Sequence, residues 1–266
     1  MTLTIGNGPL GGRPPASNYA FESPAHKILF APDPRRLRAF VGETLVLDTT
    51  GMHLLHETGI LPVPYVPLAD IDADLLERTD TTTHCPFKGD ASYWSLRVGD
   101  DVREDAVWAY EEPVEQASWL RGFAALYFDR VDRWMIEDEP LVGHIRDPYH
   151  RVDVHQSSRR VRVSAGDDLV AETERPVLLF ETSLPVRAYI PRGDLVAGRL
   201  APSPTKTICP YKGEASYWHV HANGETFADA AWSYELPLAA AMKIAGHVCF
   251  MADGITVDLV GCSSTR

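Results

Sequence analysis

Two ten-residue stretches of the chain, "CPFKGDASYW" from Cys85 and "CPYKGEASYW" from Cys209, contain residue types that can take part in catalysis or binding. In each, a lysine follows the cysteine three positions later, and a nearby cation favours the thiolate, which is the nucleophilic form of cysteine. Positions three apart on a strand face opposite sides, so the intervening proline and the following glycine would have to turn the chain. Cys85 and Cys209 are therefore candidate nucleophiles, and a small buried core residue is the alternative for each.

The lysines of these stretches, Lys88 and Lys212, each precede a glycine. A lysine beside glycine suits the capture of an anionic or carbonyl group, because glycine lets a ligand approach the backbone. A lysine exposed to solvent in a turn is the alternative reading.

Two pairs of carboxylates recur with the lysines. Glu57 and Glu181 each stand in a Glu-Thr pair at the end of an apolar run, where a carboxylate could act as a general base or pair with the lysine. A structural salt bridge or a turn cap is the competing account. Glu111 and Glu235 each follow a tyrosine and are second carboxylates that could complete an acid/base pair.

Large aromatic residues share the same segments. They are Tyr93, Trp94, Trp108 and Tyr110 in the first half of the chain, and Tyr211, Tyr217, Trp218, Trp232 and Tyr234 in the second. Aromatic rings with one polar edge make good pocket walls, and core packing is the alternative. Because adjacent residues of a strand point to opposite faces, at most one of each Tyr-Trp pair should face a given pocket.

The remaining His and Cys residues argue for structural roles and against a metal. His26 and His150 recur, and a lone histidine is more often a hydrogen-bonded structural group than a catalyst. No Cys-x-x-Cys pair is present for a tetrahedral zinc site, so we expect no metal and no cofactor. Cys249 and Cys262 have no repeated counterpart, which argues against an essential role.

These recurrences belong to a duplication. Shifting the chain by 124 positions aligns residues from Pro24 past Asp129 with the second half without a gap. The expected organisation is a flexible arm over 1–21, a first domain over 22–142 and a second over 143–266. Related domains in one chain often pack about a twofold axis, so we expect the two repeats to pair as a pseudo-dimer.

Composition limits the partners. The chain of 266 residues is 45% hydrophobic and carries a formal charge of −12, which argues against nucleic acid as a partner. No apolar run approaches the length of a membrane span, and the N-terminal residues do not resemble a signal peptide. A cytoplasmic protein with no membrane partner is the resulting expectation.

The segments that carry these residues have the sequence pattern of β-strands. Alternating apolar and polar residues in "RVRVSAGDDLVAET", with Gly-Asp at its centre, predict a β-hairpin, and similar short runs follow. The spacing favours an antiparallel β domain. Short helices are expected over 68–78 and near Leu236.

The two Cys-Pro-Phe/Tyr-Lys-Gly stretches, with the upstream Glu-Thr and Tyr-x-Pro and the downstream Trp-x-Tyr-Glu-x-Pro, carry a family resemblance. The chain resembles two tandem copies of the domain of unknown function family 427 beyond about residue 20. The resemblance implies a mainly β fold of the β-tent (Mss4-like) type. It favours the second copy as the working one, because Tyr211 fits the family pattern and Phe87 does not.

The leading hypothesis is a protein that binds a small polar or anionic metabolite in an aromatic-lined pocket of each copy, with catalysis left open. The alternatives are a thiol enzyme with Cys209 or Cys85 as nucleophile and Glu181 as base, and a non-catalytic module that binds a peptide or protein.

Overall fold

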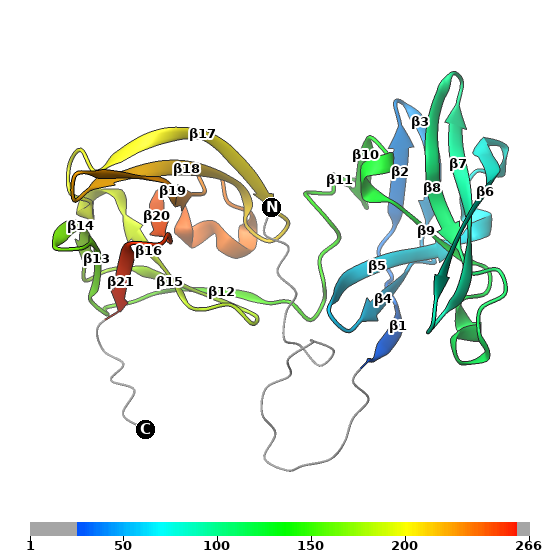
Figure 1. The fold of residues 1–266 in the computed structure, drawn as a ribbon, viewed down its shortest axis with the longest axis horizontal. Helices are drawn as coiled ribbons and strands as arrows, with labels where there is room; N and C mark the ends of the chain where they lie inside the picture. Colours follow the sequence, from blue (N-terminus) through cyan, green and yellow to red (C-terminus); the bar gives the residue numbers. More distant parts are fainter. Residues whose placement is uncertain (1–25, 260–266) are drawn as a thin grey trace, which may run out of the picture. The chain divides into compact units, whose positions relative to one another are not determined.

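The computed structural model describes residues 26–259, so the arm expected over 1–21 lies outside the described residues. The chain divides between Ile145 and Arg146 into two compact units, called here the first and second copy (Figure 1). Every strand pairing found among the described residues is antiparallel. The antiparallel β architecture in two similar halves is therefore confirmed, and the β-tent assignment and the pseudo-twofold pairing stay predictions.

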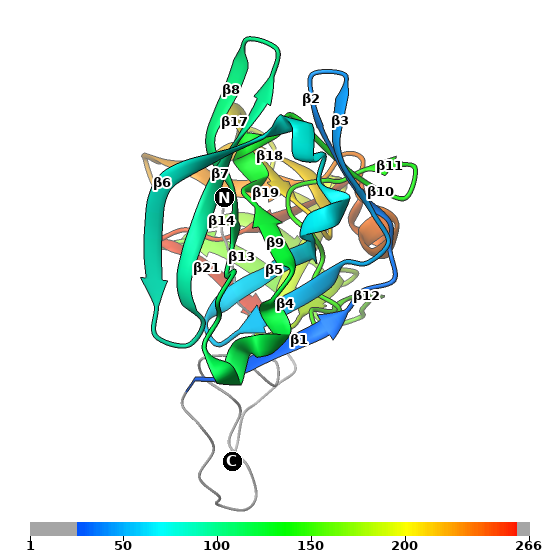
Figure 2. The same ribbon diagram turned by 90° about the vertical axis from the view of Figure 1, so that its right-hand side faces the viewer.

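The first copy contains two sheets. Its strands are β1 (Ile28–Pro32), β2 (Leu37–Val41), β3 (Thr44–Thr49), β4 (His53–Glu57), β5 (Ile60–Pro67), β6 (Leu76–Cys85), β7 (Gly89–Val98), β8 (Asp101–Ala109), β9 (Phe123–Leu126), β10 (Arg133–Ile136) and β11 (Glu139–Pro140). Seven form a sheet in the order β1-β4-β5-β9-β8-β7-β6, and four form a sheet in the order β11-β10-β2-β3. Figure 2 shows the successive hairpins that join β6, β7 and β8.

The second copy repeats this topology. Its strands are β12 (Val152–Gln156), β13 (Val161–Ala165), β14 (Asp168–Thr173), β15 (Val177–Glu181), β16 (Arg187–Pro191), β17 (Leu200–Cys209), β18 (Gly213–Ala222), β19 (Glu225–Ser233), β20 (His247–Phe250) and β21 (Ile255–Leu259). The seven-stranded order is β12-β15-β16-β20-β19-β18-β17, and β14-β13-β21 form the second sheet. The predicted hairpin is present as β13 and β14, with Gly166 in its turn at φ +55°.

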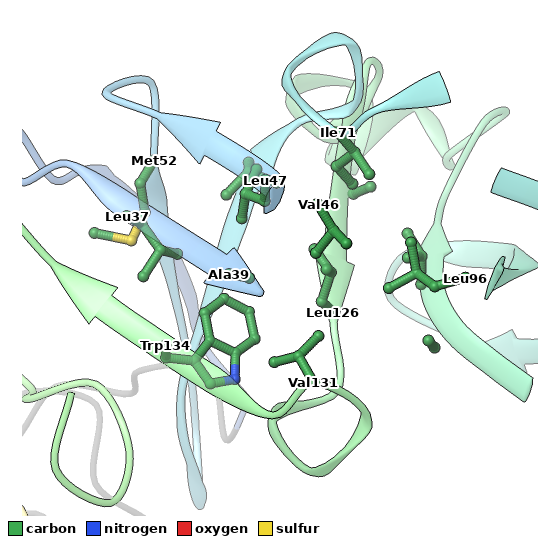
Figure 3. Packing of buried hydrophobic residues seen from close by; sticks show 14 of the residues in the cluster. Leu37, Ala39, Val46, Leu47, Met52, Ile71, Leu96, Leu126, Val131 and Trp134 are labelled. Atoms are coloured by element: carbon green, nitrogen blue, oxygen red, sulfur yellow. The ribbon is translucent and has the colours of Figure 1, made fainter. Parts of the chain in front are cut away.

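The hydrophobic core of the first copy lies between its two sheets. Residues from the smaller sheet, such as Leu37 and Leu47, pack with Leu96 and Leu126 of the larger one (Figure 3). The opposite side of the seven-stranded sheet carries a second cluster, which includes Tyr65, Tyr93 and Tyr110 in the first copy and Tyr189, Tyr217 and Tyr234 in the second. This side is called the tyrosine face below, and the side toward the smaller sheet is called the core face.

Strand alternation explains both faces. Tyr93 belongs to the tyrosine face while its neighbour Trp94 packs in the core, and Tyr217 and Trp218 are divided in the same way. The expectation that at most one member of each Tyr-Trp pair faces a given site is therefore confirmed.

The helix expected over 68–78 is wrong. The segment forms two 3-10 turns, Leu68–Asp70 and Ala73–Leu75, and then enters β6. Between the turns Ile71 is extended, almost fully buried and bridged to Leu47. Burial of this side chain and the pairing of β6 with β7 outweigh the local helical preference. The segment near Leu236 likewise forms a 3-10 turn, Ala239–Ile244, which packs on the tyrosine face.

Candidate functional site

A buried ion pair occupies the same place in both copies. Lys88 Nζ donates to Glu57 Oε2 at 2.5 Å, and Lys212 Nζ donates to Glu181 Oε2 at 2.5 Å. The exposed fraction of these four side chains is 7–11%. The pairing of glutamate with lysine, one of the roles considered from the sequence, is therefore present twice.

A histidine completes each group. His26 Nε2 lies 2.9 Å from Glu57 Oε1, and His150 Nε2 lies 3.0 Å from Glu181 Oε1. Each histidine stands just before the edge strand that pairs with the strand bearing the glutamate, since Ile28 is opposite Glu57 in the ladder. We call these three residues the His–Glu–Lys cluster of each copy.

The Cys-Pro-aromatic-Lys-Gly stretch forms the turn that delivers the lysine. Gly213 has φ +101° at the start of β18, a conformation that glycine adopts without strain. The carbonyl of Lys212 accepts from the amide of Leu238 at 3.0 Å, which holds the turn against the following segment. Gly89, at φ +106°, and Lys88 repeat this arrangement in the first copy, with Val114 as the donor.

The aromatic residue of the turn covers the histidine. The rings of Phe87 and His26 are stacked at 3.9 Å, and those of Tyr211 and His150 lie 4.4 Å apart. Burial raises the pKa of Tyr211 to about 12, although its hydroxyl accepts a hydrogen bond from the Asp147 amide. The His150 side chain is 7% exposed where that of His26 is 26% exposed, so the second cluster is the more enclosed.

The pKa of Glu181 reflects this enclosure. Burial by itself raises the pKa of the carboxyl, but the hydrogen bond with His150 and the charge and hydrogen bond of Lys212 together lower it below its ordinary value. Glu181 is therefore held as a carboxylate at neutral pH.

The matched cysteines lie on the tyrosine face and are half-buried. Burial raises the pKa of Tyr110 well above its ordinary value, with further contributions from Cys85, including a hydrogen bond. The unmatched Cys249 is fully buried, and burial raises its pKa to about 12. Cys262 lies outside the described residues.

Further tyrosines and tryptophans of this face form hydrogen-bonded pairs. Trp108 donates its indole N–H to the Tyr65 hydroxyl at 3.2 Å, and Trp232 donates to Tyr189 at 3.2 Å. The hydroxyl of Tyr93 is hydrogen-bonded to Thr83, and that of Tyr217 to Thr207. An aromatic cluster with polar edges therefore adjoins the His–Glu–Lys cluster in each copy.

The second pair of candidate carboxylates has other partners. Glu111 accepts from Arg78, whose guanidinium lies 5.3 Å from the Trp94 ring on the core face. Glu235 is paired with Arg192, which lies over the Trp218 ring. Since Glu57 and Glu181 engage His and Lys on the tyrosine face, the structure does not bring the two carboxylates of a copy into one hydrogen-bonded pair.

Two structural features near these residues were not predicted from the sequence. Arg187 lies over the Trp232 ring, at 5.9 Å from its centroid, and has no matched residue in the first copy. Asp105 and Asp229 have φ values of 49° and 51° at a bulge of the β-sheet and accept hydrogen bonds from nearby threonines. The two aspartates are 124 positions apart, so their repetition in the sequence could have identified them.

The described residues contain neither a group of metal ligands nor a membrane-spanning helix. Within 26–259 no group of three or more His, Cys, Asp or Glu side chains is placed to hold a metal ion. In the same range no helix is long and apolar enough to cross a membrane.

The fold and the two clusters define a tandem, mainly β protein with one polar centre per copy. The family described as a domain of unknown function (DUF427) matches residues 29–137 and again 153–261. The chain therefore belongs to this family, as a tandem of two of its domains. No curated protein matches the chain.

Proposed function

We propose that the protein binds a small polar or anionic molecule on the tyrosine face, next to the His–Glu–Lys cluster. The observation that carries this proposal is the buried ammonium of Lys212. An ammonium has three donors, and Glu181 is the one acceptor found for it among residues 26–259. A buried donor without an acceptor is costly, so the arrangement favours an oxygen of a ligand or an ordered water in the remaining positions.

Each member of the cluster has a distinct role in this proposal. Lys212 donates to the ligand, Glu181 accepts a hydrogen bond or a proton from it, and His150 holds the carboxylate in place. The aromatic residues Trp232 and Tyr234 supply the wall. Lys88, Glu57 and His26 offer the same set in the first copy.

Thiol chemistry has less support. The lysine that could activate Cys209 is paired with Glu181, so its charge is already offset by that carboxylate.

The test is a ligand titration followed on the indole groups. The chain has six tryptophans, so uniformly ¹⁵N-tryptophan-labelled full-length protein should give six indole signals, each assigned by a Trp→Phe variant. The panel is acetate, lactate, succinate, inorganic phosphate, benzoate and benzamide, each at about 10 mM, ten times the Kd that corresponds to about −4 kcal/mol.

We expect at least one of the anions to shift the signal of Trp232 or Trp108. The signal of Trp218 should stay in place, because its indole donates to Ser233 on the core face. Binding should be lost in Lys212→Met or Lys88→Met and kept in Lys206→Met, whose lysine is half-exposed on β17. A panel that leaves both Trp108 and Trp232 unmoved would contradict the proposal.

A further inference from the structure

The two copies share a backbone beside the tyrosine-face tryptophan but differ in the side chain that it carries. The amide of Tyr127 donates to the Ala106 carbonyl at 3.0 Å, and the amide of Met251 donates to the Ala230 carbonyl at 2.9 Å. Tyr127 and Met251 are 124 positions apart, so they occupy equivalent places. The backbone therefore makes the same hydrogen bond at this place in both copies, and the side chains differ.

In the first copy the ring of Tyr127 packs against the ring of Trp108. The ring centroids of Tyr127 and Trp108 are 4.4 Å apart, with an interplanar angle of 38°. Burial raises the pKa of Tyr127, and so does a hydrogen bond with Tyr93, which joins its hydroxyl to the network of the tyrosine face. The first copy thus shows that an aromatic ring with one polar substituent, the side chain of Tyr127, can pack against this tryptophan.

In the second copy this place has no such ring. Met251 is 53% exposed, and the one ring contact found for Trp232 in the described part of the chain is Tyr217, at a centroid distance of 6.5 Å. Trp232 is half-buried, as Trp108 is. Its surface is the counterpart of the one that Tyr127 covers.

The second copy also carries an unpaired cation at this place. Arg187 replaces Val63, the residue 124 positions earlier, and its guanidinium lies 5.9 Å from the Trp232 ring centroid. Across residues 26–259 we find no ion pair and no hydrogen-bond acceptor for this guanidinium. It is half-buried, so an anion bound to it would be partly shielded from water.

We infer that the second copy binds a planar aromatic carboxylate. Its ring lies on Trp232, in the place that Tyr127 takes on Trp108, and its carboxylate pairs with Arg187, whose planar fork matches two carboxylate oxygens. The charges of Lys212 and Glu181 offset each other, so Arg187 contributes one unpaired positive charge, which suits a monoanion better than a phosphate dianion. This inference rests on the proposed function, in which Lys212 donates to the ligand, and adds Arg187 as the charge that selects an aromatic carboxylate in the second copy. Burial raises the pKa of the Cys249 thiol, and both cations act on this thiol to lower its pKa against the effect of burial.

The experiment uses benzoate with two matched controls on the ¹⁵N-tryptophan-labelled full-length protein. Acetate keeps the charge and lacks the ring, and benzamide keeps the ring and lacks the charge. Benzoate should shift the Trp232 indole signal and leave Trp108 unmoved, with an affinity about tenfold above that of either control, since each control lacks one interaction worth roughly 1.4 kcal/mol or more.

Two variants take their residues from the first copy, where the fold accommodates them. Arg187→Val should weaken benzoate binding about tenfold and leave benzamide binding unchanged. Met251→Tyr should abolish the binding of both, because the new ring covers Trp232. Arg151→Ala serves as a control, since Arg151 is 79% exposed and pairs with Asp153.

The outcomes separate the two proposals. If acetate, phosphate or another anion shifts Trp232 while benzoate does not, or if Arg187→Val binds benzoate as well as the unmodified chain, the inference is overturned and the proposed function stands. If no compound shifts Trp108 or Trp232, both fail.

Discussion

Replacing Lys212 with methionine tests whether the His–Glu–Lys cluster is a coupled, buried unit. Methionine keeps an unbranched side chain that is one atom shorter, and it removes the charge. Glu181, whose side chain is 7% exposed, then keeps its carboxylate without the ammonium that now lies 2.5 Å away. The loss should be large because an uncompensated charge in a low-dielectric surrounding is costly.

The expected magnitude follows from the remaining partner. Breaking a buried ion pair by removing one member typically costs about 3–5 kcal/mol. Since His150 still lies 3.0 Å from Glu181 Oε1, we expect a loss at the lower end, about 3 kcal/mol of the free energy of unfolding of the second copy. The double variant with Glu181→Gln should recover part of this, which gives a coupling energy of about 2 kcal/mol in a double-mutant cycle.

The assay must read the second copy separately, because a two-domain chain need not unfold in one step. Native-state hydrogen exchange of the amides of β18 and β19, resolved by mass spectrometry, gives the opening free energy of that copy. The matched control is the pair Lys206 and Glu214 of the same copy, whose side chains are 52% and 61% exposed and whose coupling should be about 0.5 kcal/mol. A coupling energy for Lys212 and Glu181 no larger than that of the exposed pair would show that the cluster is not a coupled, buried unit.

Three further measurements probe the same region. The pKa of Glu181 is lowered from its ordinary 4.5, so its charge stabilises the fold above about pH 4.5, and this contribution is lost as the pH falls through the lower pKa of the folded state. Hydrogen exchange of the second copy, corrected for intrinsic rates, should therefore become faster from pH 5 to pH 3. The increase should be smaller in Glu181→Gln. Cys249, buried and with its pKa raised to about 12, should react with iodoacetamide at pH 8 only as fast as the second copy opens, and labelling at the rate of the denatured chain would contradict its burial. Gly213→Ala should cost about 1–3 kcal/mol because φ is +101°, whereas Gly193→Ala, with open space at its Cβ position, should stay within about 0.5 kcal/mol; equal losses would argue against strain in the turn.

The sequence allowed the strands to be predicted well and the helices poorly. Alternation in "RVRVSAGDDLVAET" depends on two faces with different surroundings, and β13 and β14 have such faces. The segment from Leu68 to Arg78 has helix-forming composition, but its path is decided by the burial of Ile71 and its β-bridge to Leu47 of β3, a tertiary contact that local composition does not encode. The placement of Tyr93 and Trp94 on opposite faces needed only strand geometry, and so it could be predicted.

The residues of the His–Glu–Lys cluster could be predicted better than the contacts between them. Repetition at 124 positions pointed to the glutamate and the lysine, and the structure joins them. The histidine was recognised as a hydrogen-bonded group, but its partner depends on the ladder between β12 and β15, which is non-local. Arg187 was not predicted because it has no repeated counterpart. Comparing the two copies identifies only the residues that both contain.

That difference bears on why the cluster is duplicated. A buried ion pair adds little stability compared with apolar residues of the same volume, so selection for the fold alone would let either copy replace it. Both copies keep the glutamate, the lysine and the histidine in the same geometry. Meanwhile the surface beside the tryptophan has changed from Tyr127 and Val63 to Met251 and Arg187. A polar cluster that both copies retain, near a surface that has changed, fits the proposal that the two domains share one mode of binding and differ in the ligand that each accepts.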